Sequence, residues 1–245
     1  ATALMLSAID PVRKIIIDEE KFTLGYRGRL RAISMAEEKH ERISEIFSHI
    51  QDKDHTIIYC SDGKSCFEGT PRVNATEEIR HLEYILHLIN TSCLSSVGSG
   101  KASKFTATED IQERMQLIDS FNKGYIEYLV AIRCLDEGIN IPSIKSALIL
   151  SSNDNYREFV QRRGRILRLY PGKEKAHIYD VIVLPSILNK AFAQIEFRRY
   201  FEYSRLALNK DILVDKLERL MSDYDLSYDD IKFNNDYVYG GDLDD

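Results

Sequence analysis

Arginine side chains gathered in residues 161–168 carry the clearest chemical signal in this sequence. The segment reads Gln-Arg-Arg-Gly-Arg-Ile-Leu-Arg, and on a helix Gln161, Arg165 and Arg168 would share one face at positions i, i+4 and i+7. Two guanidinium groups stacked in this way repel each other unless an anion lies in front of them, and Gly164 leaves room for a bulky one. Because guanidinium groups bind phosphate oxygens in a bidentate manner, the spacing indicates a polyphosphate ligand. A solvated basic helix face is the simpler alternative for the arginines taken alone.

The segment upstream of these arginines helps to decide between the two interpretations. Residues 129–132 predict an apolar strand, residues 133–140 an acidic turn with a glycine, and Pro142 a stop. A second apolar stretch at 147–150 predicts another strand shortly before the arginine-rich helix. The predicted order is therefore strand, acidic turn, strand and arginine-rich helix.

The two segments, in this order and at this spacing, resemble motifs V and VI of the second RecA-like domain of superfamily 2 helicases and translocases. The motif VI pattern Q-x-x-G-R-x-x-R is matched at Gln161, Gly164, Arg165 and Arg168. The motif V stretch at 136–142, Asp-Glu-Gly-Ile-Asn-Ile-Pro, looks most like the variant in restriction-enzyme motor subunits and repair-type DEAD/DEAH-like helicases. Residues 55–63 resemble motif IV, and the resemblance as a whole covers residues 28–184.

Apolar periodicity along the chain predicts alternating helices and strands. Helices are expected at about 29–50, 75–90 and 109–122, the last capped by Thr108, and strands at 57–60, 104–106, 128–132, 146–151 and 176–183. Strands separated by helices imply right-handed crossovers, so the expected fold is α/β, a RecA-like parallel sheet with helices on both faces. Such folds bind ligands at the carboxyl ends of the strands, where we expect motifs IV, V and VI to meet.

The pattern after Pro185 is helical only, which predicts a helical appendage packed on the sheet domain. We therefore divide the chain into a leading segment or linker at 1–27, a helicase C-terminal RecA-like domain at 28–184, and a helical C-terminal extension with an acidic tail at 185–245. The tail is expected to be solvated, with a partner-binding tail as the alternative. Because the first residue is not methionine, we expect an excised fragment.

Composition limits the classes of function. The 245 residues are 44% hydrophobic and 29% charged, as in an ordinary globular protein, and no apolar run approaches the roughly 20 residues that span a membrane. The net charge is −6, so any contact with nucleic acid must be local rather than a general positive field. Reduced thiols, a cytoplasmic location and no metal site are expected from the spacing of the four cysteines, Cys60, Cys66, Cys93 and Cys134.

A second glycine-rich segment, at 98–101, does not complete a phosphate loop. The pattern G-x-x-x-x-G-K-[ST] would need glycine at Ser95 and serine or threonine at Ala102. Nucleotide hydrolysis by these motors needs such a loop and a magnesium-binding acid. The resemblance therefore implies that ATP and Mg²⁺ are the cofactors, that an N-terminal RecA-like domain of the same protein holds the Mg²⁺, and that the isolated chain does not turn over ATP.

The resemblance also implies roles at the nucleotide. Arg165 and Arg168 would act as arginine fingers, which stabilise the charge that develops on the transferring phosphoryl group. Gln161 would contact the nucleotide or couple the two halves of the motor, while Gly138 and Asn140 lie where the family touches the ribose. Many relatives have aspartate where this chain has Asn140, so a hydroxyl hydrogen bond can be accepted there without a charge.

Other residues are implied at the nucleic-acid backbone, namely Ser61, Gly63, Thr106 and Arg133. Many relatives have Thr-Asp where this chain has Ile132-Arg133, so Arg133 would reach a phosphate by its charge. Thr106 has an alternative local role, because residues 106–109 fit a capping pattern.

The leading hypothesis is the C-terminal motor domain of an ATP-dependent DNA helicase or translocase, which forms half of an ATP cleft and half of a nucleic-acid track. An RNA helicase domain with the same motifs is the first alternative, because tracking along a backbone leaves little in the sequence to separate the two. A RecA-like interaction module without motor activity is the second. The departures at Ile132-Arg133 and Asn140 favour it, and the intact motif VI opposes it.

Overall fold

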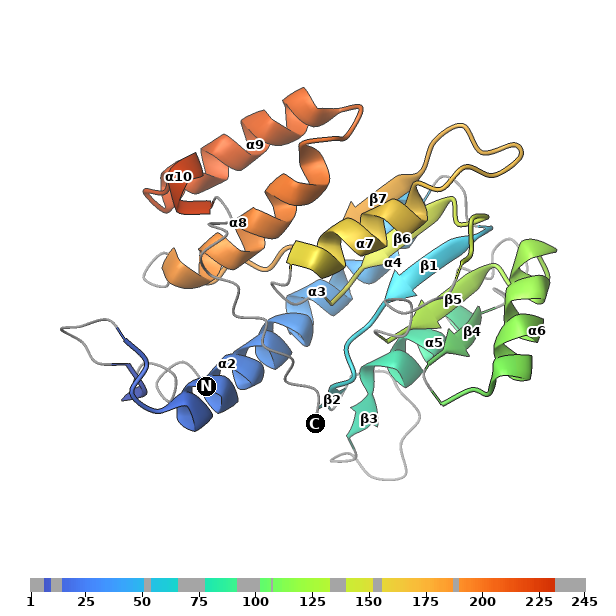
Figure 1. Ribbon diagram of the computed structural model, residues 1–245, viewed down its shortest axis with the longest axis horizontal. Coiled ribbons are helices and arrows are strands. Elements are labelled where there is room, and N and C mark those ends of the chain that lie inside the picture. The colour runs from blue at the N-terminus through green and yellow to red at the C-terminus, as the bar shows by residue number, and fades with distance from the viewer. Residues whose placement is uncertain are drawn as a thin grey trace.

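A five-stranded parallel sheet forms the centre of the molecule. The computed structural model describes residues 7–9, 15–50, 54–65, 78–91, 102–106, 108–132, 140–151, 156–186 and 190–231. The strands lie in the order β4 (Ala102–Phe105), β5 (Tyr128–Ala131), β1 (Thr56–Tyr59), β6 (Ser146–Ile149) and β7 (His177–Asp180), and every neighbouring pair is parallel (Figure 1). The predicted α/β, RecA-like fold with a parallel sheet is confirmed.

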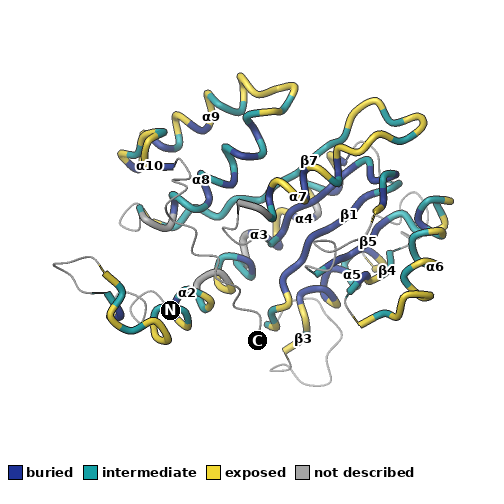
Figure 2. The backbone as a smooth tube through the Cα atoms, in the orientation of Figure 1, coloured by how far each residue is buried: buried dark blue, intermediate teal, exposed yellow. Residues whose placement is uncertain are grey.

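The register of the central strands brings their carboxyl ends to one level. Tyr59 at the end of β1 pairs with Ala131 of β5 on one side and with Ile149 of β6 on the other. Each position of these three strands is buried, because helices cover both faces of the sheet (Figure 2). The carboxyl ends of β1 and β5 therefore lie side by side.

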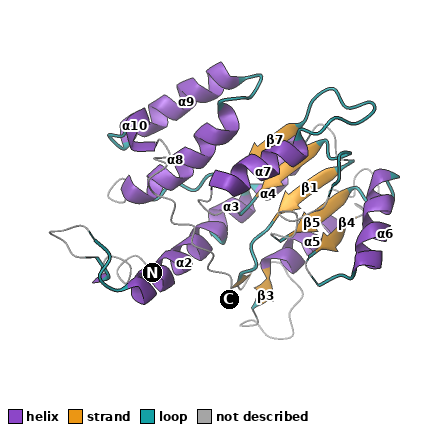
Figure 3. Cartoon of the chain, in the orientation of Figure 1, coloured by secondary structure: helices purple, strands orange, loops and turns teal. Residues whose placement is uncertain are grey.

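Two hydrophobic cores lie on opposite faces of the sheet, because successive strand residues point to opposite sides. On one face, α4 (Ile43–His49) and α5 (His81–Thr91) pack on a set that includes Ile58, Val130 and Leu148. On the other face, Phe121 of α6 (Ile111–Asn122) and Ile166 of α7 (Tyr156–Ile166) pack on a set that includes Ile57, Leu129 and Ala147. Figure 3 shows these helices on either side of the strands.

The single helix predicted at 29–50 is wrong. The structure has three helices there, α2 (Glu19–Ser34), α3 (Glu37–Glu41) and α4. The first helix begins earlier than predicted because Asp18 caps it, with its side chain accepting a hydrogen bond from the amide of Lys21 at 3.0 Å. The proposed division into domains stays a prediction, and its boundary at residues 27 and 28 lies within α2.

The predicted start of the helix at 109–122 is also wrong. The helix begins at Ile111, and Asp110 rather than Thr108 caps it. Asp110 accepts a hydrogen bond from the amide of Glu113 at 2.8 Å, and the Glu113 carboxylate accepts one from the amide of Asp110 at 3.1 Å. This reciprocal pair satisfies two amide groups at once, which a threonine cap alone does not do.

Near the predicted helix at 75–90, a short antiparallel pair of strands, β2 (Lys64–Ser65) and β3 (Ile79–Arg80), comes before α5. The helix itself begins at His81. The prediction of a helix here is confirmed, but its predicted start is too early, because residues 79 and 80 form β3 and pair with β2. Residues 75–77 lie outside the described residues.

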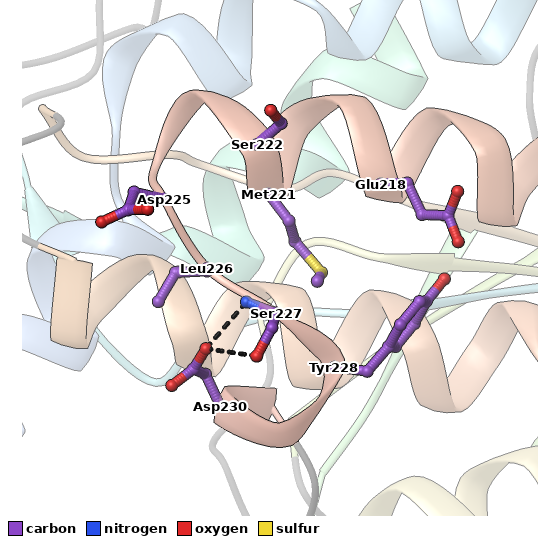
Figure 4. A pocket seen from close by; sticks show the side chains of 8 residues that line it. All are labelled: Glu218, Met221, Ser222, Asp225, Leu226, Ser227, Tyr228 and Asp230. Atoms are coloured by element: carbon purple, nitrogen blue, oxygen red, sulfur yellow. Dashed lines mark hydrogen bonds between the residues drawn. The ribbon is translucent and has the colours of Figure 1, made fainter.

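After residue 186 the secondary structure of the described residues is helical only, as predicted. It forms α8 (Lys190–Ser204), α9 (Lys210–Asp223) and α10 (Tyr228–Ile231), with a small core of their own that includes Ala193, Phe197 and Leu217. A shallow hollow between α9 and α10 is lined by Glu218, Met221, Ser222, Asp225, Leu226, Ser227, Tyr228 and Asp230 (Figure 4). The last part of the predicted acidic tail, 232–245, lies outside the described residues.

Candidate nucleotide and nucleic-acid sites

Two of the four arginines in residues 161–168 are packed inside the molecule. Arg162 is 3% exposed, lies over the ring of Tyr59 with 4.8 Å between its Cζ and the ring centroid, and donates to the Glu158 carboxylate at 3.0 Å. Arg163 is 8% exposed and donates to the main-chain carbonyl of Glu202 on α8. These two side chains hold α7 against the sheet and the C-terminal helices.

The other residues of the motif VI pattern lie toward solvent. Gln161 and Arg168 are exposed, Arg165 is half-buried, and a side chain at Gly164 would meet no atom within 4 Å. The helix ends at Ile166, so the prediction that it continues to Arg168 is wrong. A hydrogen bond between residues three apart, from the amide of Arg168 to the carbonyl of Arg165 at 3.4 Å, closes a turn at this end of the helix.

Arg168 and Asn140 are brought together although they are 28 residues apart in sequence. Arg168 Nη1 donates a hydrogen bond to Asn140 Oδ1. Asn140 is exposed, whereas Ile141 beside it is 3% exposed and anchors the segment in the core. The ends of motifs V and VI therefore form one surface that offers guanidinium and amide donors. Gly138, the third residue implied near the ribose, lies outside the described residues, as does Arg133.

The motifs do not meet at one edge of the sheet. Because α7 connects two parallel strands, it must run back across the sheet (Figure 1). Arg162, in its middle, lies near the carboxyl edge and donates to the Ser151 carbonyl at 3.4 Å. Beyond its end, Arg168 contacts Asn140, which comes before β6 at the amino edge. The expectation of a single shared edge is therefore wrong.

The loop after β1 is held by internal hydrogen bonds. Ser61 is 9% exposed, its amide donates to Nδ1 of His81 at 3.2 Å, and its hydroxyl accepts from the amide of Gly63 at 3.0 Å. A Cβ at Gly63 would lie 3.2 Å from Ser61 Oγ and 3.3 Å from Sδ of Met35, so glycine fits this close approach. Ser61 and Gly63, the two residues expected to contact the nucleic-acid backbone here, thus share one hydrogen-bonded loop at the carboxyl edge of the sheet.

A buried pair of histidines supports this loop, and the sequence analysis did not find it. His40 and His81 face each other with 3.1 Å between their Nε2 atoms. Because the Ser61 amide can only donate to His81 Nδ1, the His81 proton lies on Nε2 and is donated to His40. Burial lowers the pKa of His40 to about 4 and that of His81 to about 3. Lys39 beside them also lowers both pKa values.

This histidine pair predicts a loss of stability in mild acid. A histidine in the unfolded chain binds a proton near pH 6.5, whereas His40 and His81 in the folded chain bind one only near pH 4 and pH 3. Between those values the unfolded chain binds more protons, so the free energy of unfolding decreases as the pH is lowered. We expect the midpoint of thermal unfolding to fall by roughly 5 °C or more between pH 7 and pH 5.

Two variants separate this effect from general acid sensitivity. His81→Asn removes a titrating group and should make the pH dependence weaker. His87→Asn changes a histidine on the same helix, α5, and should keep the full dependence. Equal pH dependence in both variants would contradict the assignment.

Thr106, at the carboxyl end of β4, takes part in a local capping arrangement. Its hydroxyl donates to the Glu109 carboxylate at 2.8 Å, and its amide donates to the same carboxylate at 2.6 Å. Thr108 lies at 2.7 Å from the Thr106 hydroxyl. The local alternative considered for this residue is therefore present, and a contact with nucleic acid stays a prediction.

A buried lysine lies at the carboxyl edge beside these loops. Lys39 is 2% exposed, and its Nζ donates to the carbonyl of Leu150, directly after β6, at 2.5 Å. Burial, together with Arg199 nearby, lowers its pKa to about 8. Sequence patterns do not indicate this contact, because Lys39 stands in a segment dense in charged residues that resembles a solvated helix face.

The described residues hold no group of three histidine, cysteine, aspartate or glutamate side chains arranged to bind a metal ion. Within the same described ranges, no helix is long and apolar enough to cross a membrane.

Comparisons with known proteins agree with the motifs. The model of the family "Helicase conserved C-terminal domain" matches residues 38–170, more than half of the chain. The DNA 3'-5' translocase XPB2 of Sulfurisphaera tokodaii is 35% identical over 63 residues, which cover 26% of this chain and 14% of that protein. The putative ATP-dependent RNA helicase MJ1505 of Methanocaldococcus jannaschii is 23% identical over 209 residues, which cover 83% of this chain and 24% of that protein.

Among solved structures, the C-terminal part of the Fun30 ATPase domain has a TM-score of 0.44 and 17% identity, and the match covers 76% of this chain and 54% of that one. The chain spans less than a quarter of the length of the two curated relatives. With more than half of its residues matched by the family model, the chain belongs to the helicase conserved C-terminal domain family, the second RecA-like domain of superfamily 2 helicases and translocases.

Proposed function

We propose that this chain is the C-terminal motor domain of an ATP-dependent DNA helicase or translocase. It would supply the arginine fingers, half of the ATP cleft and half of the nucleic-acid track. The observation that carries the proposal is the difference in burial among the motif VI arginines. Arg162 and Arg163 are buried in structural contacts, whereas Arg168 is exposed beside Asn140 and Arg165 is only half-buried.

The nucleotide part of the proposal rests on the chemistry of these side chains. A triphosphate in front of the motif VI surface would receive charge-assisted hydrogen bonds from Arg165 and Arg168, and Gln161 stands exposed one helical turn before Arg165. Asn140 would accept a hydrogen bond from a ribose hydroxyl. Mg²⁺, held by an N-terminal RecA-like domain, would offset the charge of the phosphate oxygens. The isolated chain is therefore expected not to turn over ATP.

The nucleic-acid part rests on the opposite edge of the sheet. Ser61, Gly63 and Thr106 follow β1 and β4 at the carboxyl edge, and Arg133 follows β5 in the sequence. We assign these loops to backbone phosphates, which specify position and not base sequence. The nucleotide site and the nucleic-acid site would then lie at opposite edges of one sheet. Closure of this domain against the N-terminal domain around a nucleotide at one edge would change the contacts with the nucleic acid at the other.

DNA is the preferred polymer, because the matched translocase of Sulfurisphaera tokodaii acts on DNA by its name and shares 35% identity. An RNA helicase is the second candidate, since the RNA helicase relative matches over 83% of the chain. A module without motor activity would not require two arginines at the motif VI surface.

The test is ATP turnover by the full-length protein that contains this chain, measured without polymer and with single-stranded DNA, double-stranded DNA and RNA. We expect at least one form of DNA to stimulate turnover about tenfold or more, and RNA to stimulate it less. Stronger stimulation by RNA would favour the RNA helicase. No turnover with any polymer, in a protein shown to be folded, would contradict the motor proposal.

A further inference from the structure

The ammonium group of Lys173 connects the end of motif VI to the end of motif V. Its Nζ donates to the main-chain carbonyls of Ile166 at 2.5 Å, Arg168 at 3.0 Å and Pro142 at 3.3 Å. An ammonium group has three N–H donors, so these three acceptors satisfy it fully. Lys173 is half-buried, and this burial lowers its pKa.

A tight turn places Lys173 at this point. Its amide donates to the carbonyl of Tyr170 at 3.0 Å, which closes a four-residue turn with Pro171 and Gly172 in the centre. Gly172 has a φ of 75°, and proline followed by glycine with positive φ is typical of a type II turn. The backbone of Lys173 is therefore fixed by its own turn, and its side chain reaches back to both motifs.

The contacts of Lys173 fix the short segment that carries Arg168. Ile166 is the last residue of α7, so its carbonyl has no partner further along the helix, and a cation there also interacts favourably with the helix dipole. Lys173 holds the backbone of Arg168 through its carbonyl, while Asn140 holds its guanidinium. Residues 140–142, which precede β6, take part in both arrangements, because Asn140 contacts Arg168 and the carbonyl of Pro142 contacts Lys173.

We propose that Lys173 is a positioning residue for Arg168 in ATP hydrolysis. The inference rests on the proposed function, in which Arg168 contacts the transferring phosphoryl group. Because carbonyl groups accept all three of its N–H bonds, Lys173 acts through Arg168 and not on a phosphate. Without Lys173 the segment after α7 loses an anchor, and a displacement of about 1 Å at a catalytic group can lower a rate by up to about a hundredfold.

The test is ATP turnover by the full-length protein that contains this chain, with the stimulating polymer present. Lys173→Met keeps an unbranched side chain but donates no hydrogen bond, so we expect kcat to fall by between roughly tenfold and a hundredfold, with a smaller change in KM for ATP. Lys173→Arg should restore part of the rate, because a guanidinium can still donate to these carbonyls. Lys175 is exposed two residues further on, and Lys175→Met should keep the unmodified rate.

A double-mutant cycle separates positioning from a general effect on stability. In an Arg168→Ala background, Lys173→Met should lower the residual kcat by less than about twofold, because the group that Lys173 positions is gone. A loss as large as in the unmodified protein would overturn the inference, and so would a normal kcat for Lys173→Met alone. No turnover in the unmodified protein would contradict the proposed function, and the inference would fall with it.

Discussion

Replacing Arg165 with alanine is expected to lower the ATP turnover of the full-length protein by about a thousandfold or more, which corresponds to about 4 kcal/mol of lost transition-state stabilisation. Charge develops on the phosphoryl oxygens as the bond to the leaving group breaks. A guanidinium fixed on a helix stabilises that charge without reorganisation, whereas in the alanine variant only water would be present to stabilise it. The fold should survive, because Phe159, Arg162 and Ile166 form the buried side of α7.

Two comparison variants make the result specific. Arg165→Lys keeps the positive charge but loses the planar fork, so its turnover should lie between those of the unmodified protein and Arg165→Ala. Arg219→Ala removes an exposed arginine from α9 and should leave turnover unchanged. Steady-state turnover with saturating polymer is the measurement, and thermal unfolding checks the fold. An Arg165→Ala protein that is folded and fully active would rule out the arginine-finger assignment.

Replacing Arg199 with methionine is expected to lower the free energy of unfolding by about 3–5 kcal/mol. Arg199 is 2% exposed and joins β7 to α8. Its Nε donates to Asp180 at 2.9 Å, and its Nη1 and Nη2 donate to the two carboxylate oxygens of Glu196 at 2.9 and 2.8 Å. One guanidinium therefore pairs with two buried carboxylates, and the substitution would leave both carboxylates without this cationic partner.

The surroundings of this network explain why the cost is large. Glu196 also accepts a hydrogen bond from the amide of Val183 at 3.1 Å, so its carboxylate cannot turn toward solvent without breaking main-chain contacts. Burial raises the pKa of Asp180 although Arg199 beside it opposes that shift. The buried Lys39 lies close enough to act on the same carboxyl groups, but it is held by the Leu150 carbonyl. No mobile cation within the described network can replace Arg199.

Arg205→Met is the matched control for this prediction. Arg205 follows α8 and pairs with Glu202 at 2.9 Å, but 36% of its side chain is exposed, so the loss should be about 1 kcal/mol or less. Urea unfolding of each variant gives the free energies directly. A cost below about 1 kcal/mol for Arg199→Met would show that the network is not a main support of the fold.

The local patterns in the sequence were enough to predict the sheet and most of its helices. Continuous apolar runs such as 57–60 and 128–132 become strands that are buried on both faces, and that property depends only on residues close together in the chain. The spacing at 161–168 likewise places Gln161 and Arg165 on one face of α7, but the helix ends before Arg168, which therefore does not belong to that face.

Features that depend on the return path of the chain were missed. The end of α7 lies at the amino edge because a crossover between parallel strands must run backward, a consequence of topology rather than of any local pattern. The contact between Arg168 and Asn140 follows from that path, whereas the contact between His40 and His81 depends on how α3 and α5 pack against each other. In each case the partners are far apart in sequence, so neither position alone indicates the other.

Buried charge was the other source of error. Glu196 and Arg199 look like the polar side of an amphipathic helix in the sequence, yet both are 2% exposed. Burial of a charged residue is favoured by a partner of opposite charge, and one such partner of Arg199, Asp180, belongs to a strand. Periodicity measures the spacing of apolar residues and says nothing about such pairs.

The course of α7 across the sheet has a mechanical consequence. A helix of 11 residues is a stiff rod about 16 Å long. Arg162, in its middle, rests on Tyr59 near the carboxyl edge, and Arg168, just past its end, touches Asn140 near the amino edge. A stiff helix with contacts at both of these points couples the position of Arg168 to that of Arg162. Under the proposed function, a displacement of Arg168 by a bound nucleotide at one edge of the sheet would therefore be passed along α7 to Arg162 and Tyr59 at the other edge.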